Sequence, residues 1–261
     1  YAASPADALS GFEQLDYDCH EWADIRVPGS IQTQGYDVPQ YVNVQYPWDG
    51  KEMVQPGQAP QRFNPVGHYV SYFSVPEHLA GKPLCISFQG VESALALWLN
   101  GHYVGYSTDG FTPAEFDLTP YLTTGENKLA VQVFKWTAAS WVEDQDFFRF
   151  SGIFRDVYLY TVPEVHLADL KLQTRVADDF QSAELVADLL VQAQVPGSVR
   201  LVLKSGDQAL AATEMPLPAG ETLHVTLPVQ NPRLWSAEDP YLYTLEIELC
   251  DASGQVVAFV A

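Results

Sequence analysis

The densest group of chemically capable side chains lies in residues 141–156, where carboxylates, two arginines and several aromatic rings share one short run. Aromatic faces beside carboxylates are suited to binding sugars, and arginine–carboxylate pairing would hold such a segment in place. The other interpretation is a surface loop that is held together by ion pairs and binds nothing. Asp144 and Asp146 are two residues apart, so on an extended segment their side chains point to opposite sides. They are therefore a poor acid/base pair by themselves.

A second candidate is the aromatic and polar stretch of residues 35–48, GYDVPQYVNVQYPW. Pro39 and Pro47 restrict its backbone. Asn43 lies between them and carries an amide that can both donate and accept hydrogen bonds. Asn in such a loop serves either as a turn residue or as a ligand contact, and the residue type alone leaves both open.

The other reactive residue types show no spacing that is typical of a site. The six histidines lack metal-ligand spacing, and the three cysteines contain no CxxC pair, so neither a zinc site nor a disulfide framework is predicted. GxSxG, HExxH, P-loop and GxGxxG motifs are absent from the sequence. Taken by themselves, the residues indicate no complete active site.

Composition excludes several classes of protein. The 261 residues are 47% hydrophobic, which is enough for sizeable cores, and acidic residues outnumber basic ones by 33 to 13. A net charge of −20 opposes binding to nucleic acid or to anionic lipid. No apolar run approaches the roughly 20 residues that a membrane span needs, so we expect a soluble protein. Unpaired thiols and the lack of a secretion signal in residues 1–10 lead us to expect a cytoplasmic location.

The elements that must position these residues are strands, because alternation of apolar and polar residues dominates and helical periodicity is scarce. Asn100-Gly101 predicts a tight hairpin between residues 94–99 and 103–107. We expect the core of this part to contain residues that alternate with polar neighbours: Trp98, Tyr106, Phe116, Leu129, Val131 and Val133. Short antiparallel strands of this kind indicate a β-sandwich or jelly roll.

A boundary is predicted near residues 160–163, after which the aromatic residues thin out. About seven further strands follow within roughly a hundred residues, which is typical of an immunoglobulin-like sandwich. We therefore predict an all-β chain with two domains, residues 1–162 and 163–261. The last predicted strand runs to Ala261, and we expect it to be truncated there.

Four ordered motifs resemble the N-terminal part of the large bacterial β-galactosidases of glycoside hydrolase family 2. The resemblance covers the whole chain. The motifs are VPGSIQTQGYDVPQYVNVQYP, WLNGHYVGYSTDGFTPAEFDLTPYLTTGENKLAVQVFKW, WVEDQDFFRFSGIFRDVYL and NPRLWSAEDPYLYTLEIEL. The resemblance implies a jelly-roll, galactose-binding-like domain followed by an immunoglobulin-like domain, with the catalytic barrel outside this chain.

The implied parent protein hydrolyses terminal β-D-galactosyl residues with retention, using two glutamates of that barrel. The fragment alone is then expected to be inactive. Asn43 matches the Asn of the family's YxNxxYP motif, which contacts the galactosyl group. Asp146 matches the second Asp of the DQD motif, which contacts galactose and is one ligand of a sodium ion. A magnesium site in the parent protein cannot be assigned from this sequence, because Thr108 and Ala138 stand where some members have the Gln and Asp ligands of that ion.

The resemblance also implies partners: a β-galactoside, the barrel of the same polypeptide and further copies of the parent in a homo-oligomer, with no nucleic acid and no membrane. Three alternatives stay open. One is a fragment of a related β-glucuronidase or β-mannosidase. The second is a stand-alone carbohydrate-binding module, and the third is a structural assembly module.

Overall fold

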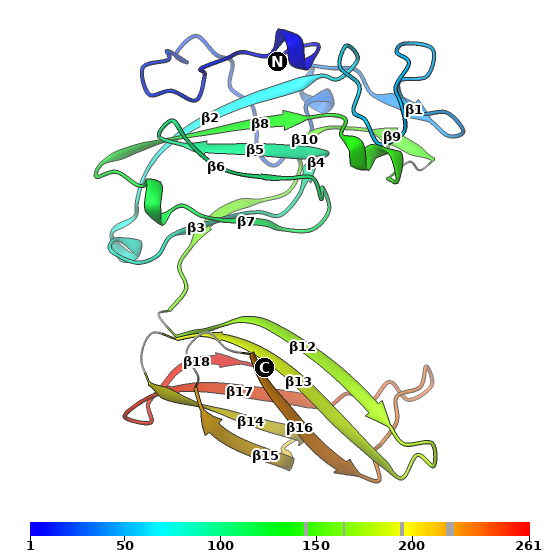
Figure 1. The fold of residues 1–261 in the computed structure, drawn as a ribbon, viewed down its shortest axis with the longest axis vertical. Coiled ribbons are helices and arrows are strands. Elements are labelled where there is room, and N and C mark those ends of the chain that lie inside the picture. The colour runs from blue at the N-terminus through cyan, green and yellow to red at the C-terminus, as the bar shows by residue number, and fades with distance from the viewer. Residues whose placement is uncertain (144–145, 164, 194–195, 218–221) are drawn as a thin grey trace. The chain divides into compact units, whose positions relative to one another are not determined.

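The computed structural model describes residues 1–143, 146–163, 165–193, 196–217 and 222–261. They form two compact units, Tyr1–Thr161 and Val162–Ala261 (Figure 1). Strands dominate both units, so the all-β prediction of a jelly roll followed by an immunoglobulin-like sandwich is confirmed. None of the helices in the described ranges is long and apolar enough to cross a bilayer.

The first unit contains eleven strands and five short 3-10 helices in the described residues. The strands are β1 (Gln40–Val42), β2 (Val66–Ser74), β3 (Cys85–Phe88), β4 (Val91–Glu92), β5 (Ala94–Leu99), β6 (His102–Ser107), β7 (Ala114–Asp117), β8 (Glu126–Phe134), β9 (Phe147–Arg149), β10 (Gly152–Ile153) and β11 (Val157–Tyr160). The helices are η1 (Pro5–Asp7), η2 (Gln32–Gln34), η3 (Glu77–Leu79), η4 (Thr119–Tyr121) and η5 (Ala138–Trp141).

Two sheets of this unit, β2-β8-β5-β6 and β11-β3-β7, enclose its core. The register pairs Leu95 with Val133 and Leu97 with Val131, and all four side chains are buried. Phe88 of β3 adds an aromatic ring from the other sheet. Because alternate residues of a strand share a face, these pairs define the inner side of the larger sheet.

The outer face of the larger sheet is covered by residues 12–17, which we call the N-terminal segment. Trp98 pairs with Ala130 and therefore lies on this outer face, where the Phe12 ring approaches it to 5.8 Å between centroids. Tyr106 is 49% exposed. The prediction that Trp98 and Tyr106 belong to the core is thus wrong, whereas Val131 and Val133 are core residues as expected.

Lys128 anchors the same N-terminal segment. Its side chain is only 2% exposed, and its Nζ donates hydrogen bonds to the main-chain carbonyl oxygens of Gln14 (2.5 Å) and Tyr17 (3.1 Å). A buried ammonium group needs hydrogen-bond partners to offset its lost hydration. The segment is therefore an integral layer of the first unit.

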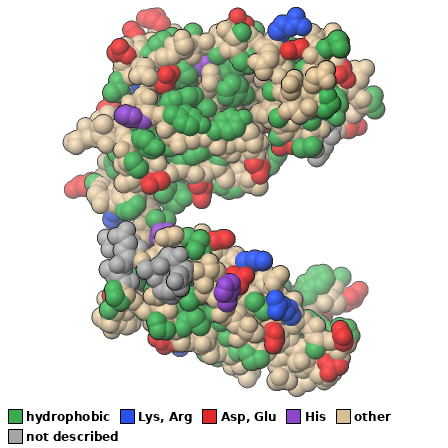
Figure 2. Space-filling view, in the orientation of Figure 1, with side chains coloured by type: hydrophobic (Ala, Val, Ile, Leu, Met, Phe, Trp, Pro, Cys, Tyr) green, Lys and Arg blue, Asp and Glu red, His purple; other side chains and the backbone are tan. Residues whose placement is uncertain are grey.

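The second unit is a sandwich of the sheets β12-β13-β16 and β15-β14-β17-β18, packed around a core of aliphatic side chains. The pairings between its described strands are all antiparallel. Figure 2 shows acidic side chains spread over the visible face of each unit, in keeping with the acidic composition. The strands of the second unit are β12 (His166–Val176), β13 (Ser182–Gln192), β14 (Gly197–Ser205), β15 (Gln208–Pro216), β16 (Thr222–Gln230), β17 (Thr244–Asp251) and β18 (Val256–Val260).

We predict that Phe12→Ala lowers the free energy of unfolding of the first unit by about 3–5 kcal/mol, because a buried ring is replaced by a cavity. Phe259→Ala is the matched control, since Phe259 is 56% exposed on β18 and should change stability by less than about 1 kcal/mol. Urea unfolding followed by tryptophan fluorescence measures both. Equal effects of the two substitutions would show that the N-terminal segment is not a structural layer.

Candidate functional site

A two-stranded ladder brings the two sequence candidates together. Strand β1 pairs antiparallel with β9, and Val42 stands opposite Phe147 at the end of the ladder. Asn43 follows β1 directly and Asp146 precedes β9 directly, so each occupies the position one step beyond that last pair. Residues more than a hundred positions apart in the sequence therefore meet at one edge of the first unit. Asp144, the other aspartate of the DQD motif, lies outside the described residues.

Asp146 is exposed, and within the described residues one hydrogen bond holds its side chain. The Tyr41 hydroxyl donates a hydrogen bond of 2.5 Å to its Oδ1. That bond to the carboxylate raises the pKa of Tyr41 above its usual value. The Tyr41 ring lies 5.5 Å from that of Phe148, its cross-strand partner. The carboxylate is thus oriented, while its Oδ2 accepts no hydrogen bond from the part of the chain that the structure describes.

Asn43 is also exposed, in the loop that connects β1 to the buried Trp48. Its Oδ1 accepts a hydrogen bond of 2.7 Å from the main-chain N–H of Val44, which fixes the orientation of the amide. Its Nδ2 makes no hydrogen bond within the described ranges and remains able to donate to a ligand. Gln40 donates from Nε2 to the carbonyl of Pro47 at 2.8 Å and closes the loop at its base.

Stacked aromatic rings support both loops. Tyr46 and Trp48 are parallel with centroids 5.3 Å apart, and Trp141 lies 4.4 Å from Tyr46 and 5.0 Å from Trp48. The Trp141 indole N–H donates to the carbonyl of Gln58 at 2.7 Å. Rings packed in this way add specific geometry to apolar burial. The cluster therefore ties the loop that carries Asn43 to the segment that leads to Asp146.

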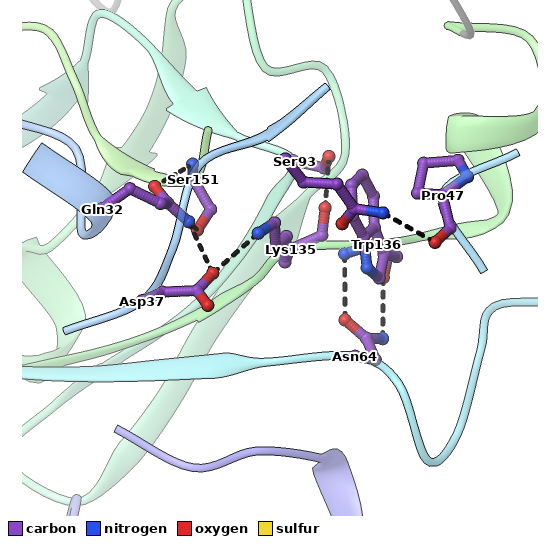
Figure 3. A network of polar contacts seen from close by, with 9 residues as sticks. Gln32, Asp37, Pro47, Asn64, Ser93, Lys135, Trp136 and Ser151 are labelled. Atoms are coloured by element: carbon purple, nitrogen blue, oxygen red, sulfur yellow. Dashed lines mark hydrogen bonds and ion pairs between the residues drawn. The ribbon is translucent and has the colours of Figure 1, made fainter. Parts of the chain in front are cut away.

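A buried polar network holds the other ends of β1 and β9 (Figure 3). Lys135 Nζ lies 2.7 Å from Asp37 Oδ2, and their side chains are only 2% and 13% exposed. Gln32 donates from Nε2 to the same Oδ2 at 2.8 Å and to Ser151 Oγ at 2.9 Å, and its Oε1 accepts from the Ser151 N–H. Burial alone would raise the pKa of Asp37, but the hydrogen bonds from Lys135 and Gln32 hold it below its usual range.

An aromatic pocket of about 390 Å³ lies beside β9 and contains Glu92, a carboxylate that sequence reasoning missed. Its position in the run GVESA gave no signal beyond a polar residue between apolar ones. Burial raises the pKa of Glu92 to about 7, which nearby Arg149 partly opposes. The carboxyl group can therefore carry a proton near neutral pH. The other lining residues are Ser30, Phe111, Phe147, Phe148, Phe150, Ser151 and Phe154.

No group of three or more His, Cys, Asp or Glu that could hold a metal ion occurs within the described ranges. Asp146 is a hard oxygen donor with one oxygen unengaged there, so it fits a place in an alkali-metal site whose other ligands come from elsewhere. Thr108 and Ala138, which stand where the resemblance implies magnesium ligands in some family members, carry no carboxylate or amide oxygen in their side chains. Asp146 therefore fits the role of one sodium ligand, whereas Thr108 and Ala138 do not fit the role of magnesium ligands.

Comparison with known protein families matches both units. Residues 4–163 match the model described as "Glycosyl hydrolases family 2, sugar binding domain", and residues 165–260 match "Glycosyl hydrolases family 2".

Curated relatives include a protein named beta-galactosidase from Halalkalibacterium halodurans, which is 49% identical, and one from Clostridium acetobutylicum, which is 46% identical. Both alignments cover 100% of this chain, but only 26% and 29% of those proteins. A beta-galactosidase large subunit of Lactobacillus helveticus is 40% identical, with 43% of it covered. The chain thus spans about a quarter of the length of the first two relatives.

Among solved structures, a beta-glucuronidase of Bacteroides uniformis gives a TM-score of 0.74 at 22% identity, over 97% of this chain and 30% of that one. A beta-glycosidase from Bacteroides vulgatus gives 0.67 at 24% identity, over 98% and 31%. At these identities the likeness concerns the fold.

We predict that Asp37→Asn lowers the free energy of unfolding by about 3 kcal/mol at pH 7, because the buried Lys135 ammonium loses its counter-charge. The folded-state pKa of Asp37 is depressed, so its contribution is present above the unfolded-state pKa near 4 and disappears as the pH falls through the folded value. Urea unfolding at pH 7 and at pH 3 measures this difference. The exposed Asp207→Asn is the control; a pH-independent effect of Asp37→Asn would contradict the assignment.

Glu92→Gln should raise the free energy of unfolding at high pH, whereas Asp37→Asn lowers it. The folded-state pKa is raised to about 7, so ionisation of Glu92 destabilises the fold increasingly as the pH rises from about 4.5 through 7. We expect the variant to be more stable than the unmodified chain by on the order of 2 kcal/mol at pH 8.5, after allowance for solvent screening, and nearly equal at pH 4.5. The exposed Glu77→Gln should show no such trend. A constant difference across this pH range would mean that Glu92 ionises normally.

Proposed function

The chain belongs to glycosyl hydrolase family 2, and we propose that it forms the N-terminal, non-catalytic part of a β-galactosidase. The observation that carries the proposal is the β1–β9 ladder, which sets Asn43 and Asp146 at one edge with polar groups available to a ligand. The relatives named beta-galactosidase, aligned over the entire chain, support the same assignment. The substrate is a terminal β-D-galactosyl residue, as in lactose-like galactosides.

The role of this chain is to complete the sugar site. An exposed amide N–H of Asn43 donates to a sugar hydroxyl, and the oriented Asp146 carboxylate accepts from another. The Tyr41 hydrogen bond fixes the carboxylate before the sugar arrives, which reduces the ordering cost of binding. Retaining hydrolysis needs two carboxyl groups about 5 Å apart, and we assign both to a barrel outside the 261 residues.

We also propose that Asp146 is one ligand of a sodium ion in the complete protein. A bound sodium ion supplies a Lewis-acid contact to a sugar hydroxyl. A carboxylate oxygen that is free in the described structure and rigidly oriented is suited to a hard cation. The remaining ligands belong to the rest of the polypeptide.

A β-glucuronidase is the competing assignment, because several structural neighbours carry that name. A glucuronide bears a carboxylate, which must be met by cationic groups. The exposed Asp146 carboxylate at the edge of the ladder would repel the carboxylate of a glucuronide, which favours a neutral galactoside.

We predict that Asp146→Asn, made in the longer polypeptide that contains this sequence, lowers kcat/KM for a chromogenic galactoside by on the order of 100-fold and removes its sodium dependence. The amide keeps the shape of the side chain but is a poorer ligand for a hard cation. Steady-state kinetics at several sodium concentrations provide the measurement. Asp16→Asn, which changes an exposed carboxylate in the N-terminal segment, is the control.

Unchanged sodium activation in the Asp146 variant would refute the ligand assignment. The 261-residue chain alone should show no turnover. Turnover that survives further purification and disappears on mutating a carboxylate of this chain would refute its non-catalytic role. A longer polypeptide that cleaves a glucuronide in preference to a galactoside would refute the substrate assignment.

A further inference from the structure

The connection between β16 and β17, residues 231–243, is a rigid loop. Arg233 forms two hydrogen bonds to Asp239, from Nε to Oδ2 at 2.9 Å and from Nη2 to Oδ1 at 2.6 Å. The main-chain N–H of Arg233 donates to the Tyr243 hydroxyl at 2.7 Å, and Ser236 and Asp239 exchange two further hydrogen bonds of 3.0 Å. Two hydrogen bonds from one guanidinium to one carboxylate fix the relative orientation of the two side chains and also pair their charges. The loop is therefore pre-organised.

This loop displays large apolar side chains to solvent. Leu234, Trp235 and Leu242 are 42%, 62% and 75% exposed, and Phe180 of the β12–β13 turn is 59% exposed beside them. These four, with Leu172 and Val176 of β12, border a groove of about 640 Å³, and we call them the apolar platform. Rigid segments that hold large apolar groups in water are typical of surfaces that another protein surface covers.

The charge of the groove indicates the chemistry of what covers it. Only Glu184 and Arg233 among its lining residues are ionisable at neutral pH, and Arg233 is already paired with Asp239. The rest of the lining is aliphatic, aromatic or uncharged polar. A charged or strongly hydrated partner would gain little here, whereas an apolar protein surface fits.

The topology of the second unit places one polypeptide segment beside the platform. Strand β18 runs antiparallel to β17 and pairs Val260 with Ile247. Strand β17 begins at Thr244, directly after the rigid loop. β18 therefore runs toward the end of the sandwich that carries the platform. Ile247, the partner of Val260, is five residues from Leu242 of the platform, or at most roughly 17 Å of extended chain. Any polypeptide that continues from Ala261 emerges next to the platform.

We propose that the apolar platform is the docking surface for the polypeptide that follows Ala261, in an interface within one chain. The proposal rests on the proposed function only in treating this chain as the N-terminal part of a longer protein. The relatives that it matches are about four times as long, which supplies such a segment. Covalent continuity gives that segment a high effective concentration at the platform, so no separate partner is needed.

Hydroxyl-radical footprinting with mass spectrometry tests the proposal on unmodified proteins. The 261-residue chain is compared with the longer polypeptide that contains it, at several protein concentrations. We expect Trp235 and Leu242 to be readily oxidised in the 261-residue chain. In the longer polypeptide, oxidation of Trp235 should fall to the level of Trp48, which is only 1% exposed and serves as the internal standard.

Persistent oxidation of Trp235 in the longer polypeptide would overturn the proposal. Protection that grows with protein concentration would overturn it too, because the occupant would then be a second copy. Galactosidase activity is assayed separately. A longer polypeptide without activity but with protected Trp235 would refute the proposed function and leave the docking surface standing.

A pair of matched substitutions provides a second readout. Leu242→Asp should leave the Tm of the 261-residue chain nearly unchanged, because the side chain is exposed there. In the longer polypeptide it should lower the Tm, since an unpaired carboxylate would be buried in an apolar interface. Leu15→Asp is the control, because Leu15 is 64% exposed in the N-terminal segment and should be tolerated in both proteins. Equal tolerance of Leu242→Asp in both would count against the interface.

Discussion

The arrangement of the candidate site depends on one buried ion pair, Lys135 with Asp37. Taking two charges out of water is costly, and their attraction compensates only when the remaining hydrogen-bonding capacity is also satisfied. Gln32 meets that condition, because it donates to Asp37 and joins Ser151 through both its amide oxygen and its nitrogen. Asp37 stands three residues before β1 and Ser151 two residues after β9. The pair therefore fixes the two strands from the ends opposite to Asn43 and Asp146.

Two kinds of support act on this ladder. The polar network sets the position of β1 and β9, and the packed rings of Tyr46, Trp48 and Trp141 set the outer loops. Hydrogen bonds specify direction, whereas ring packing mainly excludes water and limits movement. The exposed groups at the edge need both, because neither Asn43 nor Asp146 is packed against the core. A ligand-binding edge can thus be stiff although its own residues are solvated.

The sequence was informative where local chemistry decides the structure. Asn100 and Gly101 adopt φ values of 52° and 82°, and the hairpin lies where the dipeptide predicted it. Pairing of β1 with β9 was not predictable in this way, since each strand has three residues and the partners are far apart in the sequence. Both candidates were first singled out by their residue chemistry, their roles came from the motif resemblance, and their proximity emerged only from the fold. Lys128 lies near the start of β8 and Lys135 directly follows its end. The strand alternates in polarity, so nothing local indicated that these two lysines are buried. Trp98 was misplaced because β5 is covered on both faces, which removes the contrast that alternation relies on.

The anchoring of the N-terminal segment has a consequence for how that segment can evolve. Lys128 binds it through the carbonyl oxygens of Gln14 and Tyr17. Every amino acid presents the same carbonyl group, so this attachment does not depend on which side chains occupy those two positions. Homologues can therefore accumulate substitutions there while the segment keeps its place, provided that a lysine remains on the strand. Sequence divergence in this segment is then a poor guide to structural divergence.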